Sequence, residues 1–238
     1  MLSNFIGTNI SKMRIPAIII GIIISLNSTA QVTPQEIRKH KISCYVQTQS
    51  ASDGGDSSVY RKYFDRQGND TSFYSGDMLV ERKKYFLNRM GRIEKRVSFD
   101  GGGKEKETAI YSYKTDGSYQ VTNTDKQFGM TDYEWYDKKG NLAKTKSPDG
   151  NTTSYTYNTK NQLLSTKSDG YNGGTVIDIT YLYNTKGQRI KAESKGEYRW
   201  TKTYTYNKAG LTEKVITVSS DEGVTTIVTD RYKYEFLK

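Results

Sequence analysis

Tyrosine and basic residues recur together in the second half of this 238-residue sequence, and they are its best candidates for binding chemistry. Aromatic rings beside cations can bind sugars, anionic glycans or single-stranded nucleic acid. An alternative is that the Lys and Arg stems merely cover tyrosine rings and keep the protein soluble. The candidate face comprises Tyr155, Tyr157, Lys167, Tyr181, Tyr183, Arg189, Lys191, Tyr204 and Tyr206.

Side-chain alternation explains why these residues are grouped. Successive side chains of a strand point to opposite faces, so Tyr155 and Tyr157 share one face. If Tyr157 pairs with Leu163, simple alternation places Lys167 on that same face. The same reasoning groups Tyr181 and Tyr183 with Arg189 and Lys191. The sequence therefore predicts a ladder of tyrosines edged by cations.

Groups suited to acid–base or metal chemistry are few. His40 is the one histidine, and its neighbours Arg38, Lys39 and Lys41 indicate a solvated position. Cys44 is the one cysteine, whereas a zinc site needs three or four Cys or His ligands. We therefore expect no metal and no cofactor.

Carboxylates remain as candidates for glycosidic hydrolysis, which uses a pair of them. Asp100, Asp137, Asp149 and Asp169 all stand in turn-like stretches, and that role accounts for their presence. The run 101–104, Gly-Gly-Gly-Lys, resembles a fragment of a phosphate-binding loop without its remainder. The sequence favours a non-catalytic protein, with a secreted enzyme as an alternative.

A repeated turn motif predicts the β-hairpins that position the tyrosines. Asp137-Lys138-Lys139-Gly140 fits a type I turn followed by a left-handed residue, a common hairpin connection. Asn158 to Asn161 and Asn184 to Gly187 fit the same rule, with Asn161 as the permitted substitute for glycine. The flanking segments are rich in aromatic and β-branched residues, as strands are. Each unit therefore reads as one β-hairpin.

These hairpin units repeat along the chain, with leading aromatic residues 21 to 28 residues apart. A period in this range indicates a repeat architecture. We predict an all-β fold of about sixteen strands at two per repeat, an array of antiparallel β-hairpins forming an extended, twisted or spiralling sheet over residues 59–238. The leading residues are Phe64, Phe86, Tyr113, Tyr136, Tyr157, Tyr183, Tyr206 and Tyr234.

The pattern Tyr136-Asp137-x-x-Gly140-Asn141-Leu142 resembles the YD repeats of the RHS (rearrangement hot spot) family, as do the Tyr-x-Tyr forms at 155–157, 181–183 and 204–206. The resemblance covers roughly residues 60–238 and is strongest in the second half. It implies a β-repeat structure of the kind that encloses a toxin in large family members, and a place at the cell surface or outside the cell. An orphan core fragment of a polymorphic toxin system is therefore a further alternative.

The first thirty residues have the form of a secretory signal peptide. Lys12 and Arg14 precede an apolar run from Ile15 to Leu26, and small residues end the segment at Ala30. The run is shorter than the about 20 residues of a transmembrane helix, so we expect no stable membrane span after cleavage. Translation can start at Met1 or Met13. The expected location is the periplasm, the outer surface or the medium.

Composition limits the partners. The chain carries a formal charge of +10, but its basic residues are spread along the sequence, and with export this disfavours nucleic acid as a ligand. Residues 31–58 are predicted to be a lead-in arm, helical or extended, with a flexible loop at 50–58. The expected partner is a glycan or another cell-surface protein.

Overall fold

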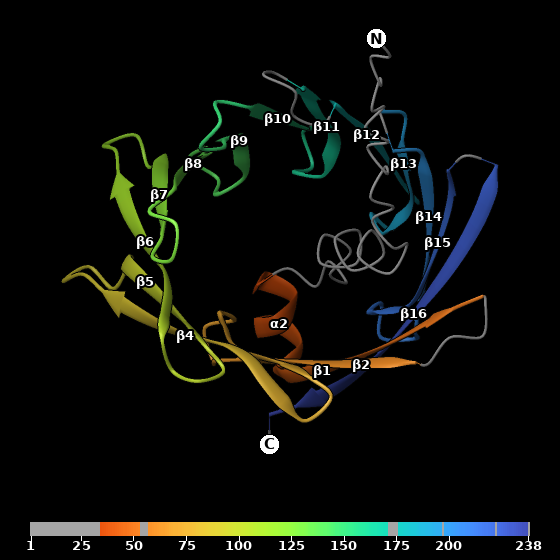
Figure 1. Ribbon diagram of the computed structural model, residues 1–238, viewed down its shortest axis with the longest axis horizontal. Coiled ribbons are helices and arrows are strands. Elements are labelled where there is room, and N and C mark those ends of the chain that lie inside the picture. The colour runs from red at the N-terminus through yellow and green to blue at the C-terminus, as the bar shows by residue number, and fades with distance from the viewer. Residues whose placement is uncertain (1–33, 53–56, 171–175, 197, 222, 238) are drawn as a thin grey trace, which may run out of the picture. The chain divides into compact units, whose positions relative to one another are not determined.

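The computed structural model describes residues 34–52, 57–170, 176–196, 198–221 and 223–237, within a compact unit spanning Val32–Lys238. The signal peptide predicted at 1–30 lies outside the described residues, as does part of the loop predicted at 50–58. The described elements are one short helix and sixteen strands (Figure 1). They are α2 (Pro34–His40), β1 (Ile42–Ala51), β2 (Ser58–Phe64), β3 (Asp70–Ser75), β4 (Met78–Leu87), β5 (Ile93–Asp100), β6 (Glu105–Tyr113), β7 (Tyr119–Asp125), β8 (Thr131–Tyr136), β9 (Leu142–Lys146), β10 (Thr152–Tyr157), β11 (Leu163–Asp169), β12 (Val176–Tyr183), β13 (Arg189–Ser194), β14 (Trp200–Tyr206), β15 (Thr212–Asp221) and β16 (Val224–Phe236).

Every strand pairs antiparallel with the next strand along the chain, which confirms the predicted all-β hairpin array. The first strand also pairs with the last, from Ile42 opposite Phe236 to Ala51 opposite Val228. This pairing closes the sheet into a barrel (Figure 1), so the sheet is not open and extended. Closure gives every strand two neighbours and leaves no unpaired edge.

The strand array begins earlier than residue 59. β1 lies inside the predicted lead-in, and its backbone pairs with β2 as well as with β16. Residues Pro34–His40 before this strand form the helix α2, so this part of the arm is helical and not extended. The lead-in is therefore part of the barrel from Ile42 onward.

The predicted turns are present. The Gly140 amide donates to the Asp137 carbonyl at 2.9 Å, and the Asp137 carboxylate accepts the amides of Lys139 and Asn141. The residue that closes each turn is left-handed, with φ of 83° at Gly140, 82° at Gly187 and 66° at Asn161.

One leading residue of the repeats was placed incorrectly. The turn of the second repeat runs from Asn88 to Gly91, whose amide donates to the Asn88 carbonyl at 2.9 Å. Leu87 therefore precedes this turn, and Phe86 does not. The repeat is degenerate here because Leu replaces the aromatic residue.

Leading tyrosines connect neighbouring hairpins. The Tyr157 hydroxyl donates to the Leu142 carbonyl at 3.0 Å, and the Tyr183 hydroxyl donates to the Leu163 carbonyl at 2.9 Å. Tyr206 makes the equivalent bond to the preceding hairpin. Each bond satisfies a backbone carbonyl near the start of the return strand of the previous repeat. The repeated tyrosine is thus a link between repeats.

An apolar cluster anchors the helix to the barrel. Ile37 of α2 is buried with Ile42 and Leu211, and the half-buried Phe64 and Tyr234 pack against them. Burial of three aliphatic side chains contributes roughly 1.5–3 kcal/mol each.

Within the described ranges, no helix combines the length and apolar character that crossing a membrane requires.

Candidate functional site on the inner face of the barrel

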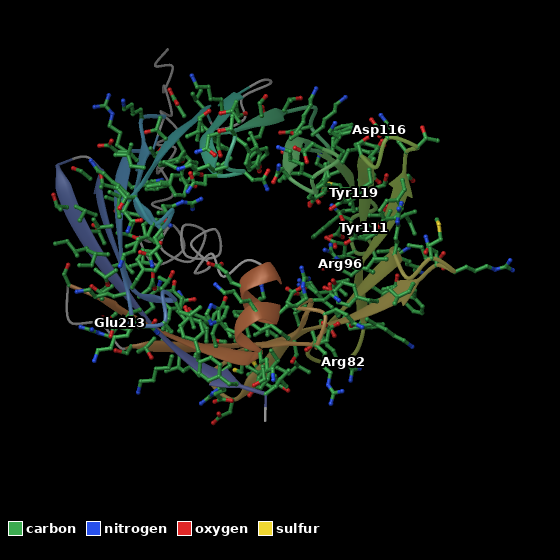
Figure 2. The ribbon with its side chains drawn as sticks, turned by 180° about the vertical axis from the view of Figure 1, so that it is seen from behind. Arg82, Arg96, Tyr111, Asp116, Tyr119 and Glu213 are labelled. Carbon is green, nitrogen blue, oxygen red and sulfur yellow. The ribbon has the colours of Figure 1, made fainter. Side chains whose placement is uncertain are left out.

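Alternation divides the strand residues into two faces, and the candidate tyrosines occupy the inner one. Residues directly opposite each other on paired strands share a face. Tyr181 lies opposite Ala192, Ala192 opposite Lys202, and Lys202 opposite Thr217, and all three partners are buried. Figure 2 shows the same arrangement across the barrel, where Tyr111 and Tyr119 point to the inside.

The inner face brings together seven of the nine candidate residues. Their shared position follows from the register of β10 to β15, in which each tyrosine meets another inward side chain. The six tyrosines are half-buried, and the arginine is buried. They are Tyr155, Tyr157, Tyr181, Tyr183, Tyr204, Tyr206 and Arg189.

Lys167 and Lys191 were placed on this face incorrectly. Lys167 lies opposite Ser154, and Lys191 lies opposite Leu182, so both point to the outer face. The cause is a β-bulge after each turn, where the register shifts between Thr156 and Tyr157 and again before Tyr183. One extra residue on the return strand reverses the alternation beyond it.

Arg189 is enclosed by tyrosine rings. Its guanidinium carbon lies 4.3 Å from the ring centre of Tyr181, 5.7 Å from that of Tyr183 and 5.9 Å from that of Tyr204. The residue is 8% exposed. Its Nη2 donates to the Tyr183 hydroxyl at 3.1 Å, while Nε and Nη1 have no hydrogen-bond partner among the described residues. Cation–π contact compensates part of the cost of burying this charge.

A second buried charge lies on the neighbouring strand. Lys202 is 3% exposed, and burial lowers the pKa of its ammonium to about 8. Asp230 is 1% exposed, and burial raises the pKa of its carboxyl group. Asp230 accepts hydrogen bonds from Gln47 at 3.0 Å and Gln49 at 3.1 Å. These bonds join β16 to β1 at the position where the barrel closes.

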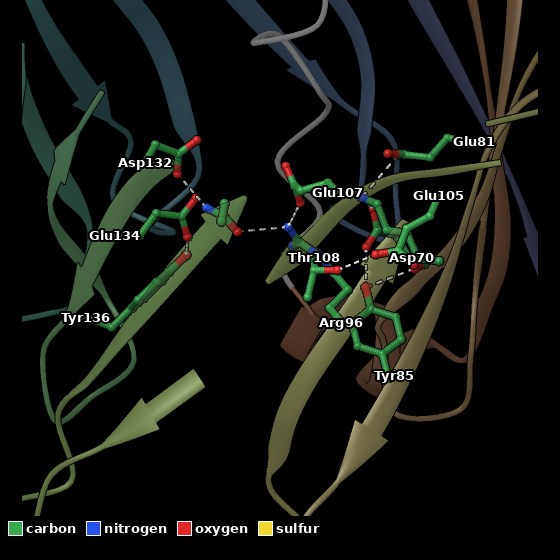
Figure 3. A network of polar contacts seen from close by, with 12 residues as sticks. Asp70, Glu81, Tyr85, Arg96, Glu105, Glu107, Thr108, Asp132, Glu134 and Tyr136 are labelled. Carbon is green, nitrogen blue, oxygen red and sulfur yellow. Dashed lines mark hydrogen bonds and ion pairs between the residues drawn. The ribbon is translucent and has the colours of Figure 1, made fainter. Parts of the chain in front are cut away.

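The opposite part of the inner face carries a polar network (Figure 3). Asp70 receives hydrogen bonds from Lys83 at 2.7 Å and the Tyr85 hydroxyl at 2.8 Å. Burial alone would raise the pKa of Asp70, but Lys62 and Lys83 hold it well below its usual range. These residues belong to the degenerate repeats, and the sequence reasoning missed them.

The network continues along the next strands. Arg96 donates to Glu107 at 2.5 Å and to Asn123 at 3.3 Å, and Asn123 donates to Asp132 at 2.7 Å. In Figure 2 the Arg96 side chain points to the inside of the barrel. The charged residues of β4, β5 and β6 stand in consecutive runs, so the sequence carries no charge alternation that would have found these residues.

Aromatic stacking completes this side. The rings of Tyr119 and Tyr136 are 4.5 Å apart and 7° from parallel. The Tyr136 hydroxyl donates to Glu134 at 2.6 Å, and burial with this carboxylate raises the pKa of Tyr136. The inner face therefore combines ring faces with hydrogen-bonding groups throughout.

The residues considered for catalysis lie elsewhere or have other tasks. Cys44 is buried, and burial raises the pKa of its thiol to about 11, which disfavours the reactive thiolate. Asp100 and Asp137 accept backbone amides of their own turns. The side chain of Asp169 lies outside the described residues. Among described residues, no three His, Cys, Asp or Glu side chains are placed to hold a metal ion.

Comparison with known proteins agrees with the repeat pattern and the fold. The curated proteins contain no match to this chain. A porin-like protein from Bacteroides uniformis ATCC 8492 has a similar fold, with a TM-score of 0.51 at 15% identity, covering 82% of this chain and 97% of that one. The TcdB2-TccC3-Cdc42 structure gives a TM-score of 0.28 at 12% identity, covering 71% of this chain and 13% of that one. The RHS Repeat family model matches residues 136–172, which confirms the predicted resemblance to RHS repeats in that part of the chain.

Proposed function

We propose that this chain is an exported, non-catalytic binding module that holds a glycan on the inner face of its barrel. The observation that carries the proposal is the row of half-buried tyrosine rings at Tyr155, Tyr181 and Tyr204 beside Arg189. Half-buried rings keep part of their surface available to a ligand. The mouths and interiors of β-barrels are common places for ligand sites.

The chemistry of the inner face suits a sugar. A sugar ring has an apolar face of C–H groups, which packs on an aromatic ring, and hydroxyl groups that need hydrogen-bond partners. The Tyr181 hydroxyl lies 3.2 Å from the Thr166 hydroxyl, so the ring platform has polar groups at its rim. Arg96 and Asp70 add charged donors and acceptors on the other side.

The proposal of a non-catalytic role rests on the surroundings of the carboxylates and the thiol. The turn carboxylates already accept backbone amides, and the one thiol is buried with a raised pKa. Export rests on the signal-like segment that ends at Ala30. Mass spectrometry of the native N-terminus should find Gln31 as the first residue. Recovery of the chain with residues 1–30 intact would contradict export by cleavage.

The binding proposal is tested by a glycan array on the exported protein, followed by calorimetric titration of the best ligand. Tyr181→Ala should weaken binding about 2- to 10-fold, from the roughly 0.5–1.5 kcal/mol of an aromatic contact. Tyr181→Phe should retain most of the affinity, because the ring remains. The matched control is Tyr133→Ala, since Tyr133 stacks with Trp135 on the outer face.

Two results would contradict the proposal. One is an array without any glycan ligand. The other is equal loss of affinity in Tyr181→Ala and the outer-face control, which would mean that the inner ring makes no specific contact. Circular dichroism of each variant confirms that the barrel is intact.

A further inference from the structure

A pocket of about 550 Å³ lies where β13 ends and β14 begins, beside the end of β15 and the start of β16. The hairpin turns at 184–187 and 207–210 lie at the opposite ends of β13 and β14. The volume of the pocket is in the range of small-molecule sites. The lining residues that carry the argument are Lys195, Arg199, Trp200, Thr201, Ser219 and Thr225.

An aromatic ring and a hydroxyl group give this pocket its binding chemistry. Trp200 is half-buried, and the Lys202 Nζ lies 5.0 Å from its ring centre, which helps to hold the indole in place. Ser219 lies opposite Trp200 on the paired strand, so its hydroxyl shares the face of the indole. Thr201 and Thr225 also line the pocket, but alternation places their side chains on the other face of the sheet. A ring platform with a hydroxyl group beside it suits a sugar ring.

The charge of the pocket favours an anion. Lys195 and Arg199 are exposed, and neither forms an ion pair with another described side chain. Glu193, which also lines the pocket, is paired with Lys191 at 3.0 Å. Among the described lining residues, these two cations remain available to a negative group, and the planar guanidinium of an arginine matches a carboxylate well.

We propose that this pocket binds an acidic saccharide, with a sugar ring on Trp200 and its carboxylate between Arg199 and Lys195. A hydroxyl group of the sugar then faces the Ser219 side chain. This site uses residues other than the tyrosines and Arg189 of the inner face. It therefore stands or fails independently of the inner-face proposal.

The test is calorimetric titration of the exported protein with trigalacturonic acid, and with galactotriose as the uncharged probe. The acidic trisaccharide should bind, and the neutral one should bind at least tenfold more weakly. Trp200→Ala and the double variant Arg199→Gln, Lys195→Gln should each reduce the affinity for the acid at least tenfold. The double variant Lys167→Gln, Lys233→Gln is the control, since it removes the same charge from exposed positions on the outer face of the barrel.

The outcomes separate this site from the inner face. Equal affinity in the pocket variants and the wild type would overturn the proposal, as would equal binding of the neutral probe. A loss of trigalacturonic acid binding in Tyr181→Ala alone would place the acid on the inner face instead. A single-stranded oligonucleotide that binds through Trp200 while the trisaccharide does not would assign the pocket to nucleic acid and also overturn it.

Discussion

The tyrosines of this protein divide into two kinds by position. Tyr157, Tyr183 and Tyr206 precede a turn, and their hydroxyls bind carbonyls of the preceding hairpin. Tyr155 and Tyr181 stand two residues earlier in their strands, and their half-buried rings line the inside. One residue type thus connects the repeats and provides the candidate binding surface.

The linking role predicts a loss of stability. Tyr157→Phe removes the hydrogen bond to the Leu142 carbonyl, and the free energy of unfolding should fall by about 0.5–1.5 kcal/mol. Urea denaturation measures this change. Tyr133→Phe is the control, because the hydroxyl of Tyr133 has no hydrogen-bond partner among the described residues. Equal stabilities for the two variants would show that the link contributes nothing.

Lys202 predicts a dependence of stability on pH. Its pKa is about 8 in the folded barrel and 10.5, the ordinary value of a lysine, in the unfolded chain, so the unfolded chain binds more protons between these values. Stability from this residue should therefore rise with pH through that window, by about 1–2 kcal/mol from pH 8 to 9.5. Lys202→Met should remove the rise.

The wild type must be compared with Lys202→Met because Cys44 changes the stability in the opposite direction as pH rises. Its thiol pKa is raised from 9.0 to about 11, so its contribution falls as pH rises above 9. The difference in unfolding free energy between wild type and Lys202→Met cancels this effect. A difference that stays constant from pH 7 to 9.5 would mean that Lys202 titrates normally.

At the scale of the element, the turn residues determine the hairpins. Gly140 has φ of 83°, and a Cβ added there would meet nothing within 4 Å. The first side-chain atom therefore has free space at this position, and the conformational cost should dominate the effect of a substitution. At Gly187, by contrast, the new Cβ would lie 3.1 Å from Gln162.

Gly140→Val should destabilise the protein by about 1–2 kcal/mol, the cost of a left-handed conformation for an L-residue. Gly140→Asn should cost less, because Asn161 adopts the same conformation in the neighbouring repeat. Urea denaturation of both variants decides the point. Equal costs for Val and Asn would contradict the left-handed assignment.

The sequence predicted the hairpins better than the faces of their strands. The Asp-x-x-Gly turns and the Tyr-x-Tyr pairs were placed correctly because each depends on local conformation. Lys167 and Lys191 were misplaced because a bulge follows each turn and reverses the alternation of the return strand. This bulge belongs to the turn type that was predicted, so its effect on the face was accessible from the sequence.

At the scale of the whole molecule, closure turns a row of hairpins into a barrel with an inside. The closing strands, β1 and β16, come from opposite ends of the described chain. Their contact includes the buried Asp230, which accepts hydrogen bonds from Gln47 and Gln49. The sequence did not predict this pairing, because β1 has no turn motif before it and its partner is distant along the chain.

The candidate sites depend on the same closure. The inner face exists because the sheet closes, and the tyrosines of an open sheet would face solvent on a free surface. The network from Asp70 to Arg96 was missed because its contacts join side chains of different strands, and the pairing register decides which of them meet. Closure of the sheet is therefore the claim on which the account depends most.

A disulfide across β1 and β16 tests that claim most directly. Thr48 and Arg231 are paired on these strands, and directly paired antiparallel residues have the Cα separation that a disulfide requires. Thr48→Cys with Arg231→Cys, in a Cys44→Ala background, should form an intramolecular disulfide under mild oxidation, identified by peptide mass spectrometry. Thr156→Cys with Ser165→Cys is the positive control, because that pair lies within one hairpin and forms in an open or a closed sheet. A disulfide in the control pair with none, or only an intermolecular one, between positions 48 and 231 would contradict the closed barrel.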